Sequence, residues 1–281
     1  MKTVKASDGQ VISYDTWGTN SSSPIILLQG LGMDSRGYGL QRYMLSKDHL
    51  CIAIDHRGSS ATSVKSEFSL YRMARDVLRV MENENISSAH IVGTSMGGII
   101  AQILATVYPS RVKSLTLIST SCSQHRWRSE LLQEWKQRLL SRNSKVLDRE
   151  ILSWLIGPRL LHRSKMFLPI AQQLFQEIDV EQFCMQIDAI CSFSDTFKSK
   201  LGLISAPTHV IVGSQDTLTP VGDSQELCMY IRNSELSIVY GTAHGVIIES
   251  PVQVGRLILQ GIEKYAKNNM DLYLDSKLQA Y

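Results

Sequence analysis

A serine flanked by glycines, where a strand pattern turns into a helix pattern, constrains this chain more than any other feature. Residues 93–98 read Gly-Thr-Ser-Met-Gly-Gly, after the apolar run 90–92 and before the helix-like stretch 99–105. The glycines leave room for a sharp, strained turn, which exposes the hydroxyl of Ser95 and directs the next amide N–H, that of Met96, toward the same point. The sequence therefore predicts a nucleophilic serine at the end of a buried strand.

A nucleophilic serine needs a base, and the base needs a carboxylate that orients it. The apolar run 208–213 leads into a loop that carries Asp216, and the run 235–239 leads into a loop that carries His244. Catalytic groups of parallel α/β sheets collect at the carboxyl ends of the strands. We therefore expect Asp216, as the orienting acid, and His244, as the base, to join Ser95 there.

An oxyanion site needs a second N–H besides that of Met96, because one donor leaves much of the charge of a tetrahedral intermediate unstabilised. The buried-strand pattern 24–29 ends in a glycine-rich turn at residues 30–34. The amide of Leu31 in this turn is the candidate for the second donor. The alternative is a glycine turn without a catalytic part.

The distribution of strand and helix patterns predicts the domain organisation. Strand and helix patterns alternate up to about Cys122, only helix patterns follow until about Lys200, and the alternation then resumes. Such alternation is typical of a parallel sheet flanked by helices. We expect residues 1–122 and 201–267 to form one α/β core and residues 123–200 to form an inserted, all-helical cap over the site. Residues 268–281 are expected to be a C-terminal tail, either a surface helix or disordered.

The cap region carries its own helix signals. We expect helices over residues 129–140 and 146–156, the second of which stops at a Gly-Pro pair. Asp179 and Gln182 have the spacing of a capping box at the start of a third helix. Substrate choice is expected to be encoded in this cap, because the core loops supply the catalytic groups.

Taken together, these motifs resemble the α/β-hydrolase superfamily, in particular its branch of small serine esterases, enol-lactonases and antibiotic methylesterases. The resemblance covers residues 4 to about 266. It is carried by Gln29-Gly30-Leu31-Gly32, Asp55-His56-Arg57-Gly58, the segments 93–98 and 213–220, and Gly241-Thr242-Ala243-His244-Gly245 followed by Glu249-Ser250-Pro251. It implies an eight-stranded, mostly parallel sheet flanked by helices, with an inserted helical cap, and the chain order serine, acid, histidine. Gln29 stands where the family commonly has histidine, which leaves the Leu31 donor in place but alters hydrogen bonding in the oxyanion loop.

The resemblance and the residues together favour a serine hydrolase that cleaves a small or medium carboxylic ester, lactone or thioester through an acyl-enzyme. Two alternatives stay open at this point. One is acyl transfer or cofactor-free elimination in a biosynthetic pathway, carried out at the same site. The other is a ligand-binding receptor that retains the triad.

Bulk properties bear on cofactors, partners and location. Seven histidines and five scattered cysteines show no metal-ligand or redox spacing, so we expect neither a metal nor another cofactor. The formal net charge of +3 is too small and dispersed for nucleic acid. Without a signal-peptide or membrane-spanning pattern, a cytoplasmic location is expected. Residues 126–165 hold ten lysine or arginine residues against four acidic ones, which indicates either a solvated basic face or a surface for an acidic substrate or carrier protein.

Overall fold

An eight-stranded sheet forms the centre of the molecule in the computed structural model, which describes residues 1–19, 23–57, 68–142, 149–162 and 179–278. The strands are β1 (Lys2–Lys5), β2 (Val11–Trp17), β3 (Ile25–Leu28), β4 (Cys51–Asp55), β5 (Ala89–Thr94), β6 (Val112–Ile118), β7 (Thr208–Gly213) and β8 (Ser234–Val239). Their spatial order is β1-β2-β4-β3-β5-β6-β7-β8. Strand β2 is antiparallel to both of its neighbours, and the other pairs are parallel. The expected eight-stranded, mostly parallel sheet is confirmed.

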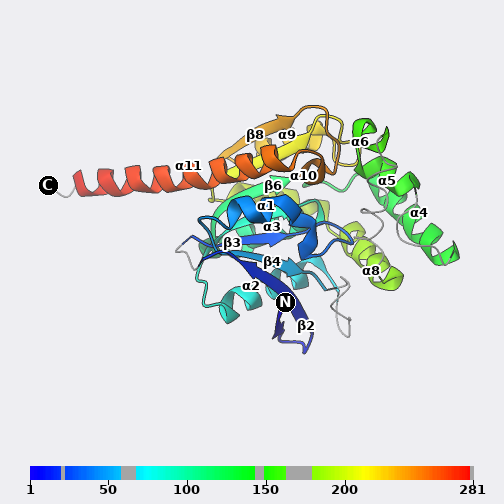
Figure 1. The fold of residues 1–281 in the computed structure, drawn as a ribbon, viewed down its shortest axis with the longest axis horizontal. Helices are drawn as coiled ribbons and strands as arrows, with labels where there is room; N and C mark the ends of the chain where they lie inside the picture. The colour runs from blue at the N-terminus through cyan, green and yellow to red at the C-terminus, as the bar shows by residue number, and fades with distance from the viewer. Residues whose placement is uncertain (20–22, 58–67, 143–148, 163–178, 279–281) are drawn as a thin grey trace.

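Helices cover both faces of this sheet (Figure 1). The described α-helices are α1 (Gly39–Leu45), α2 (Leu70–Asn83), α3 (Met96–Val107), α4 (Arg126–Arg142), α5 (Arg149–Leu155), α6 (Pro158–His162), α8 (Val180–Cys191), α9 (Val221–Tyr230), α10 (Val246–Glu249) and α11 (Pro251–Leu278). Short 3₁₀ segments span Ser35–Tyr38, Pro109–Arg111 and Asp195–Leu203.

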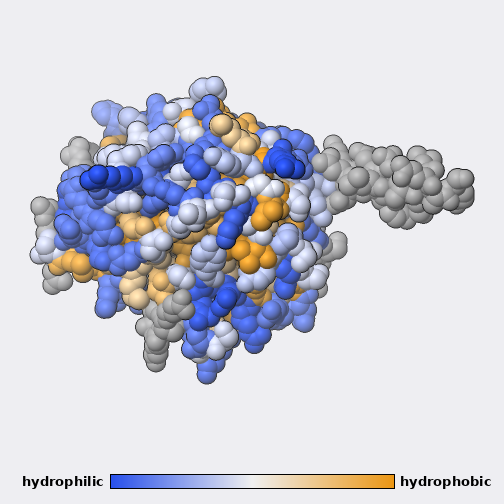
Figure 2. Space-filling view, turned by 180° about the vertical axis from the view of Figure 1, so that it is seen from behind, coloured by the Kyte–Doolittle hydropathy of each residue, from blue (hydrophilic) through white to orange (hydrophobic). Residues whose placement is uncertain are grey.

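Strand β3 shows how the two faces become two hydrophobic cores. All four of its residues are buried. Ile26 and Leu28 belong to a cluster with residues of α2 and α3, whereas Ile25 and Leu27 belong to a cluster with residues of α1 and α11. Successive side chains of a strand point to opposite faces, so a continuous apolar run is the pattern of a strand covered on both sides. The face shown in Figure 2 is mostly hydrophilic, with apolar patches towards its middle.

The cap helices α4, α5, α6 and α8 gather at one end of the sheet (Figure 1). Helix α4 is longer than the expected 129–140. Helix α5 accounts for residues 149–155 of the expected 146–156, and residues 146–148 lie outside the described residues. The capping box at Asp179 is half correct. The Asp179 carboxylate accepts hydrogen bonds from the amides of Glu181 and Gln182. The amide oxygen of Gln182 has no partner within the described residues, so the return bond does not form.

The C-terminal helix α11 runs without interruption through residue 268, where we expected the tail to begin. Its last turns extend beyond the sheet (Figure 1). Of the two forms considered for residues 268–281, the structure therefore shows a helix up to Leu278. No helix in the described ranges combines the length and apolar character that a membrane span needs.

Candidate active site

Ser95 lies between β5 and α3, where the chain turns sharply. Its backbone has φ +53° and ψ −118°, a conformation that is rare for a residue with a side chain. Close packing of α3 against β3 imposes this turn. A Cβ atom built on Gly97 would lie 2.2 Å from the carbonyl oxygen of Leu28, and one on Gly93 would lie 2.3 Å from the carbonyl oxygen of Gly97. Both glycines are therefore needed for the strained turn that the sequence predicts.

The structure brings Ser95, His244 and Asp216 together, although they lie in three separate loops. His244 Nε2 is 3.0 Å from Ser95 Oγ. His244 Nδ1 is 3.0 Å from Asp216 Oδ2 and 3.2 Å from Asp216 Oδ1. The His244 and Asp216 residues are 6% and 5% exposed. These distances are those required of a nucleophile, its base and the group that orients the base.

The environment of Asp216 keeps this acid ionised. Its Oδ1 accepts hydrogen bonds from the amides of Leu218 and Thr219, and its Oδ2 accepts one from the Thr219 hydroxyl. Burial acts to raise the pKa of Asp216, but the adjacent His244 and the bonds from Thr219 outweigh burial and hold the pKa below its usual value. An ionised Asp216 can only accept at His244 Nδ1, which leaves Nε2 free to accept the Ser95 proton.

The candidate oxyanion donors flank Ser95. Met96 is the first residue of α3, so its N–H has no intrahelical acceptor. The turn that carries Leu31 lies directly against the serine, because a Cβ built on Gly30 would be 3.2 Å from the Ser95 Cβ. Leu31, Met96 and Ser95 line the same cavity. The residues that carry both candidate amides therefore lie beside the nucleophile.

A cap residue that the sequence did not indicate contacts the turn at residues 30–34, which carries Leu31 and is called the oxyanion turn below. The side chain of Gln186 on α8 is fully buried. Its Oε1 accepts a hydrogen bond of 2.8 Å from the Gly32 amide, and its Nε2 donates one of 3.3 Å to the Arg57 carbonyl. Gly32 and Gln186 are 154 positions apart in the sequence, so no local sequence pattern could indicate this contact.

The cap also contacts the loop that carries His244. The Gly245 amide donates to the Leu155 carbonyl over 2.6 Å. Glu249 Oε1 accepts from the amides of Ala243, at 2.9 Å, and Gly157, at 3.2 Å. Burial raises the pKa of Glu249, although both amide bonds act to lower it. The turn between α5 and α6 is thus bonded to the base-bearing loop.

A cavity of about 170 Å³ opens between Ser95 and the cap. Ser95 and His244 line this cavity together with several polar residues, whereas Asp216 lies behind His244 and does not line it. Its walls are apolar and come mainly from the cap and the core loops: Leu31, Met33, Met96, Ile99, Leu132, Trp135, Ile151, Leu152, Leu155, Ile156, Leu160, Phe183, Ile190, Leu218, Ile247 and Ile248. Trp135 is 2% exposed and therefore both packs in the core and lines the cavity.

Basic side chains of the cap are largely engaged within the protein. Among those described, Arg126 pairs with Glu130, Arg128 with Asp223, Lys136 with Asp188, and Arg138 with Glu134 and Glu150. These pairs support the interpretation of a solvated and internally compensated face. An acidic carrier protein stays a prediction.

The described residues beside the serine include neither a metal site nor a reactive thiol. In the described ranges, no three His, Cys, Asp or Glu side chains are grouped as a metal site requires. Cys122, near the end of β6, is buried, and burial raises the pKa of its thiol to about 12. A thiol with such a pKa is protonated at neutral pH and is a poor nucleophile.

Comparison with known proteins agrees with the fold described above and finds hydrolases among the similar proteins. Residues 23–152 match the family model described as the alpha/beta hydrolase fold. The chain is 25% identical over 242 residues to the putative carbamate hydrolase RutD of Azorhizobium caulinodans, covering 85% of this chain and 91% of that protein. It is 23% identical over 247 residues to 3-oxoadipate enol-lactonase 1 of Acinetobacter baylyi, covering 86% and 90%. A thermophilic esterase from Thermogutta terrifontis has the same fold, with a TM-score of 0.85 at 21% identity over 94% of this chain and 99% of that chain.

Proposed function

The chain belongs to the α/β-hydrolase superfamily, and from this premise we propose that it is a serine hydrolase acting on a small or medium carboxylic ester, lactone or thioester. The observation that carries the proposal is the hydrogen-bonded series from Ser95 through His244 to Asp216, at 3.0 Å for each link. Ser95 and His244 line a cavity large enough for a small substrate.

The geometry supports the following acylation step. Ser95 Oγ attacks the carbonyl carbon while His244 Nε2 takes the hydroxyl proton. The negative charge that develops on the carbonyl oxygen is stabilised by the amides of Leu31 and Met96. Collapse of the tetrahedral intermediate breaks the bond to the leaving group, which receives the proton from His244. The product of this step is an acyl ester on Ser95.

Deacylation repeats these steps with water. The water oxygen attacks the acyl carbon while His244 Nε2 takes a proton from that water. When the carboxylic acid departs, His244 returns the proton to the Ser95 oxygen. Asp216 keeps its charge throughout and stabilises the imidazolium form of His244 in both steps.

The apolar cavity walls favour a substrate whose acyl or alcohol group is apolar and binds beneath the cap. Cavities of this kind bind through the burial of apolar surface, and the described lining residues expose little polar surface that could fix a highly polar substrate. The names of similar proteins include a carbamate hydrolase, an enol-lactonase and an esterase, and all three denote hydrolysis of an acyl bond.

A panel of activated esters of increasing acyl length tests this proposal. We expect turnover of short and medium apolar chains by the wild type, and loss of turnover in both Ser95→Ala and His244→Ala with little change in the melting temperature. If Ser95→Ala keeps the native activity while His244→Ala loses it, the reaction is a proton abstraction of the elimination type and the hydrolase proposal is wrong.

A further inference from the structure

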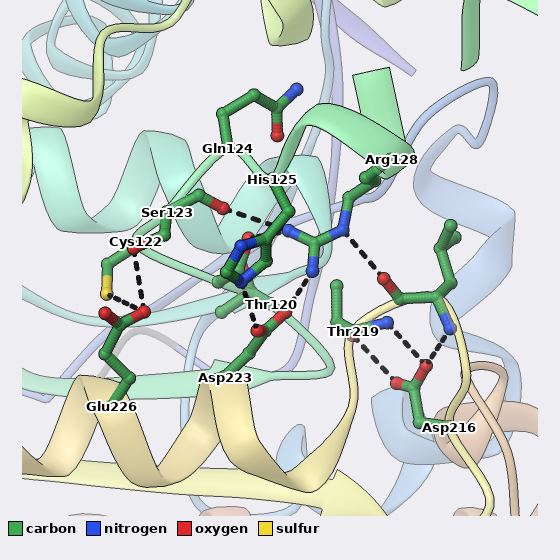
Figure 3. Close-up of polar contacts among 12 residues, drawn as sticks. Thr120, Cys122, Ser123, Gln124, His125, Arg128, Asp216, Thr219, Asp223 and Glu226 are labelled. Carbon is green, nitrogen blue, oxygen red and sulfur yellow. Dashed lines mark hydrogen bonds and ion pairs between the residues drawn. The ribbon is translucent and has the colours of Figure 1, made fainter. Parts of the chain in front are cut away.

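Arg128 lies at the junction between the cap and the core. It is near the start of the cap helix α4, yet it is only 3% exposed. Figure 3 shows its guanidinium between Asp223 on α9 and the loop that carries Asp216. It lines the substrate cavity but is not one of the groups required for acyl transfer.

The guanidinium donates hydrogen bonds in several directions at once. Nε donates to the Leu218 carbonyl over 2.8 Å. Nη1 donates to the Ser121 hydroxyl at 2.8 Å and to the Ser123 carbonyl at 3.0 Å. Nη2 pairs with the Asp223 carboxylate (Figure 3). A planar group with five donors can serve all of these acceptors, and a single ammonium cannot.

One of these bonds reaches the catalytic acid through a single residue. Leu218 accepts the Arg128 bond at its carbonyl, and its amide donates to Asp216 Oδ1 over 3.0 Å. The Thr219 amide, which shares a peptide unit with that carbonyl, donates to the same oxygen over 2.8 Å. Asp216 in turn contacts His244 Nδ1. The position of Leu218 therefore affects where the carboxylate lies relative to the imidazole.

A purely stabilising role accounts poorly for this arrangement. Burying an ion pair costs desolvation free energy that the attraction often only offsets, so apolar residues of similar size are frequently as stable. The bond to Leu218 contributes something that apolar residues cannot replace, namely a fixed position for the acid loop. Catalysis is sensitive to displacements of about 1 Å, which can lower rates about 100-fold.

We propose that Arg128 is a positioning residue that couples the cap to the catalytic acid: by holding the Leu218 carbonyl, it fixes Asp216 against His244. This inference rests on the proposed hydrolase function, in which Asp216 orients the base. It makes the cap a part of the catalytic apparatus as well as a wall of the substrate cavity.

The test separates positioning from stability with a paired substitution. In Arg128→Met with Asp223→Leu, the ion pair is replaced by apolar side chains and no buried charge is left alone. We expect a melting temperature near that of the wild type, a kcat lower by about 10- to 100-fold, and KM within about twofold. If the double variant has both the melting temperature and the kcat of the wild type, Arg128 acts only through stability and the proposal is overturned.

Arg128→Lys is the second variant, and it tests the positioning role even if the double variant does not fold. It keeps the charge beside Asp223, but one ammonium cannot occupy both the Nε and the Nη2 positions of the guanidinium. We expect a folded protein with reduced kcat, and a wild-type kcat would overturn the proposal. Arg126→Met is the matched control, because Arg126 lies on the same helix in an exposed pair with Glu130 and should not change kcat.

A proton NMR signature keeps this test independent of hydrolase activity. The Nδ1–H of His244, bonded to Asp216, should give a low-field resonance that is absent from His244→Ala. We expect the resonance to shift or broaden in both Arg128 variants and to stay unchanged in Arg126→Met. An unchanged resonance in the Arg128 variants contradicts the positioning role. If the wild type hydrolyses no ester but the resonance responds to Arg128, the hydrolase proposal fails and the positioning role stands.

Discussion

At the scale of single residues, the turn at Ser95 depends on how closely the backbone of α3 approaches β3. Gly97 is the point of closest approach, because the carbonyl oxygens of Leu28 and Gln29 occupy the space that a Cβ atom on this residue would need. Backbone atoms cannot move aside as a flexible side chain can. The strain at Ser95 is thus maintained by packing around it, as is common where a strained residue is functional.

Gly97→Ala tests this packing. The added methyl group would require a backbone shift of α3 or β3, so we expect a loss of about 1–3 kcal/mol in the free energy of unfolding, together with a lower reactivity of Ser95. Denaturant titration measures the first effect. Gly222→Ala on α9 is the matched control, because nothing lies within 4 Å of its added Cβ, and alanine should stabilise that helix by up to about 1 kcal/mol. Equal stability changes in the two variants would contradict the packing argument.

At the scale of secondary-structure elements, each of three cap segments holds one catalytic loop. Helix α4 contacts the acid loop through Arg128, and the turn after α5 contacts the histidine loop through Leu155 and Gly157. Helix α8 contacts the oxyanion turn through Gln186. The same segments supply much of the cavity wall. A change in the cap is therefore expected to alter substrate choice and catalytic rate together.

Gln186→Leu tests the contact between α8 and the oxyanion turn. Removal of the acceptor for the Gly32 amide leaves a buried donor unpaired and frees the turn that carries Leu31, so we expect kcat to fall by about tenfold or more. KM should change less, because the cavity wall stays in place. Gln182→Leu, one turn earlier on α8, does not line the cavity and should keep the wild-type kcat. A similar loss of kcat in both variants would show a general effect of disturbing α8.

These contacts also show how far sequence reasoning could reach. Ser95, Asp216 and His244 could be predicted because each follows a strand pattern and carries local turn chemistry. Gln186 and Arg128 could not, because an amide or a guanidinium on an amphipathic helix gives no sign of which distant backbone group it binds. Strand β1 was also not placed by residue pattern, because three of its four residues are exposed and two are lysines. Edge strands of this kind lack the apolar run that marks the central strands.

At the scale of the whole molecule, buried acidic side chains lie at or just after the carboxyl ends of the strands, as Asp55 and Asp216 do. Asp55, the last residue of β4, is 2% exposed and accepts a hydrogen bond of 2.7 Å from the Ser35 amide. Burial raises the pKa of this carboxyl to about 6, and the nearby Asp34 and Asp15 add to the increase, while the Ser35 bonds act against it. Ionisation of Asp55 therefore disfavours the folded state.

This buried acid gives a pH dependence with a definite sign. The folded pKa of Asp55, about 6, lies above the ordinary value of 3.8, so the folded state binds more protons than the unfolded state between about pH 4 and pH 6. The stability contributed by Asp55 is fully present below pH 4 and is lost as the pH rises through 6. Two pKa units correspond to about 3 kcal/mol at most.

Asp55→Asn isolates this contribution from those of the other acids. We expect the variant to gain stability relative to the wild type as the pH rises, because only the wild type must ionise a buried acid. The difference in the free energy of unfolding, variant minus wild type, should be larger at pH 7 than at pH 4.5 by about 2 kcal/mol, since about 1.5 of the two pKa units lie above pH 4.5. Denaturant titrations of both proteins at both pH values provide the measurement, and the effects of other titrating groups cancel in the difference. A difference that does not change with pH would show that Asp55 is readily ionised in the folded state.

The formation of a covalent adduct on Ser95 tests the proposed function most directly. Intact-mass measurement after incubation with a fluorophosphonate, and after brief mixing with an activated ester, counts the groups attached to the protein. We expect one adduct per chain, located on Ser95 by peptide mapping, absent from Ser95→Ala and strongly slowed in His244→Ala. An adduct that persists in Ser95→Ala, or a wild-type protein that turns over the ester while Ser95 remains unmodified, would contradict nucleophilic catalysis by this residue.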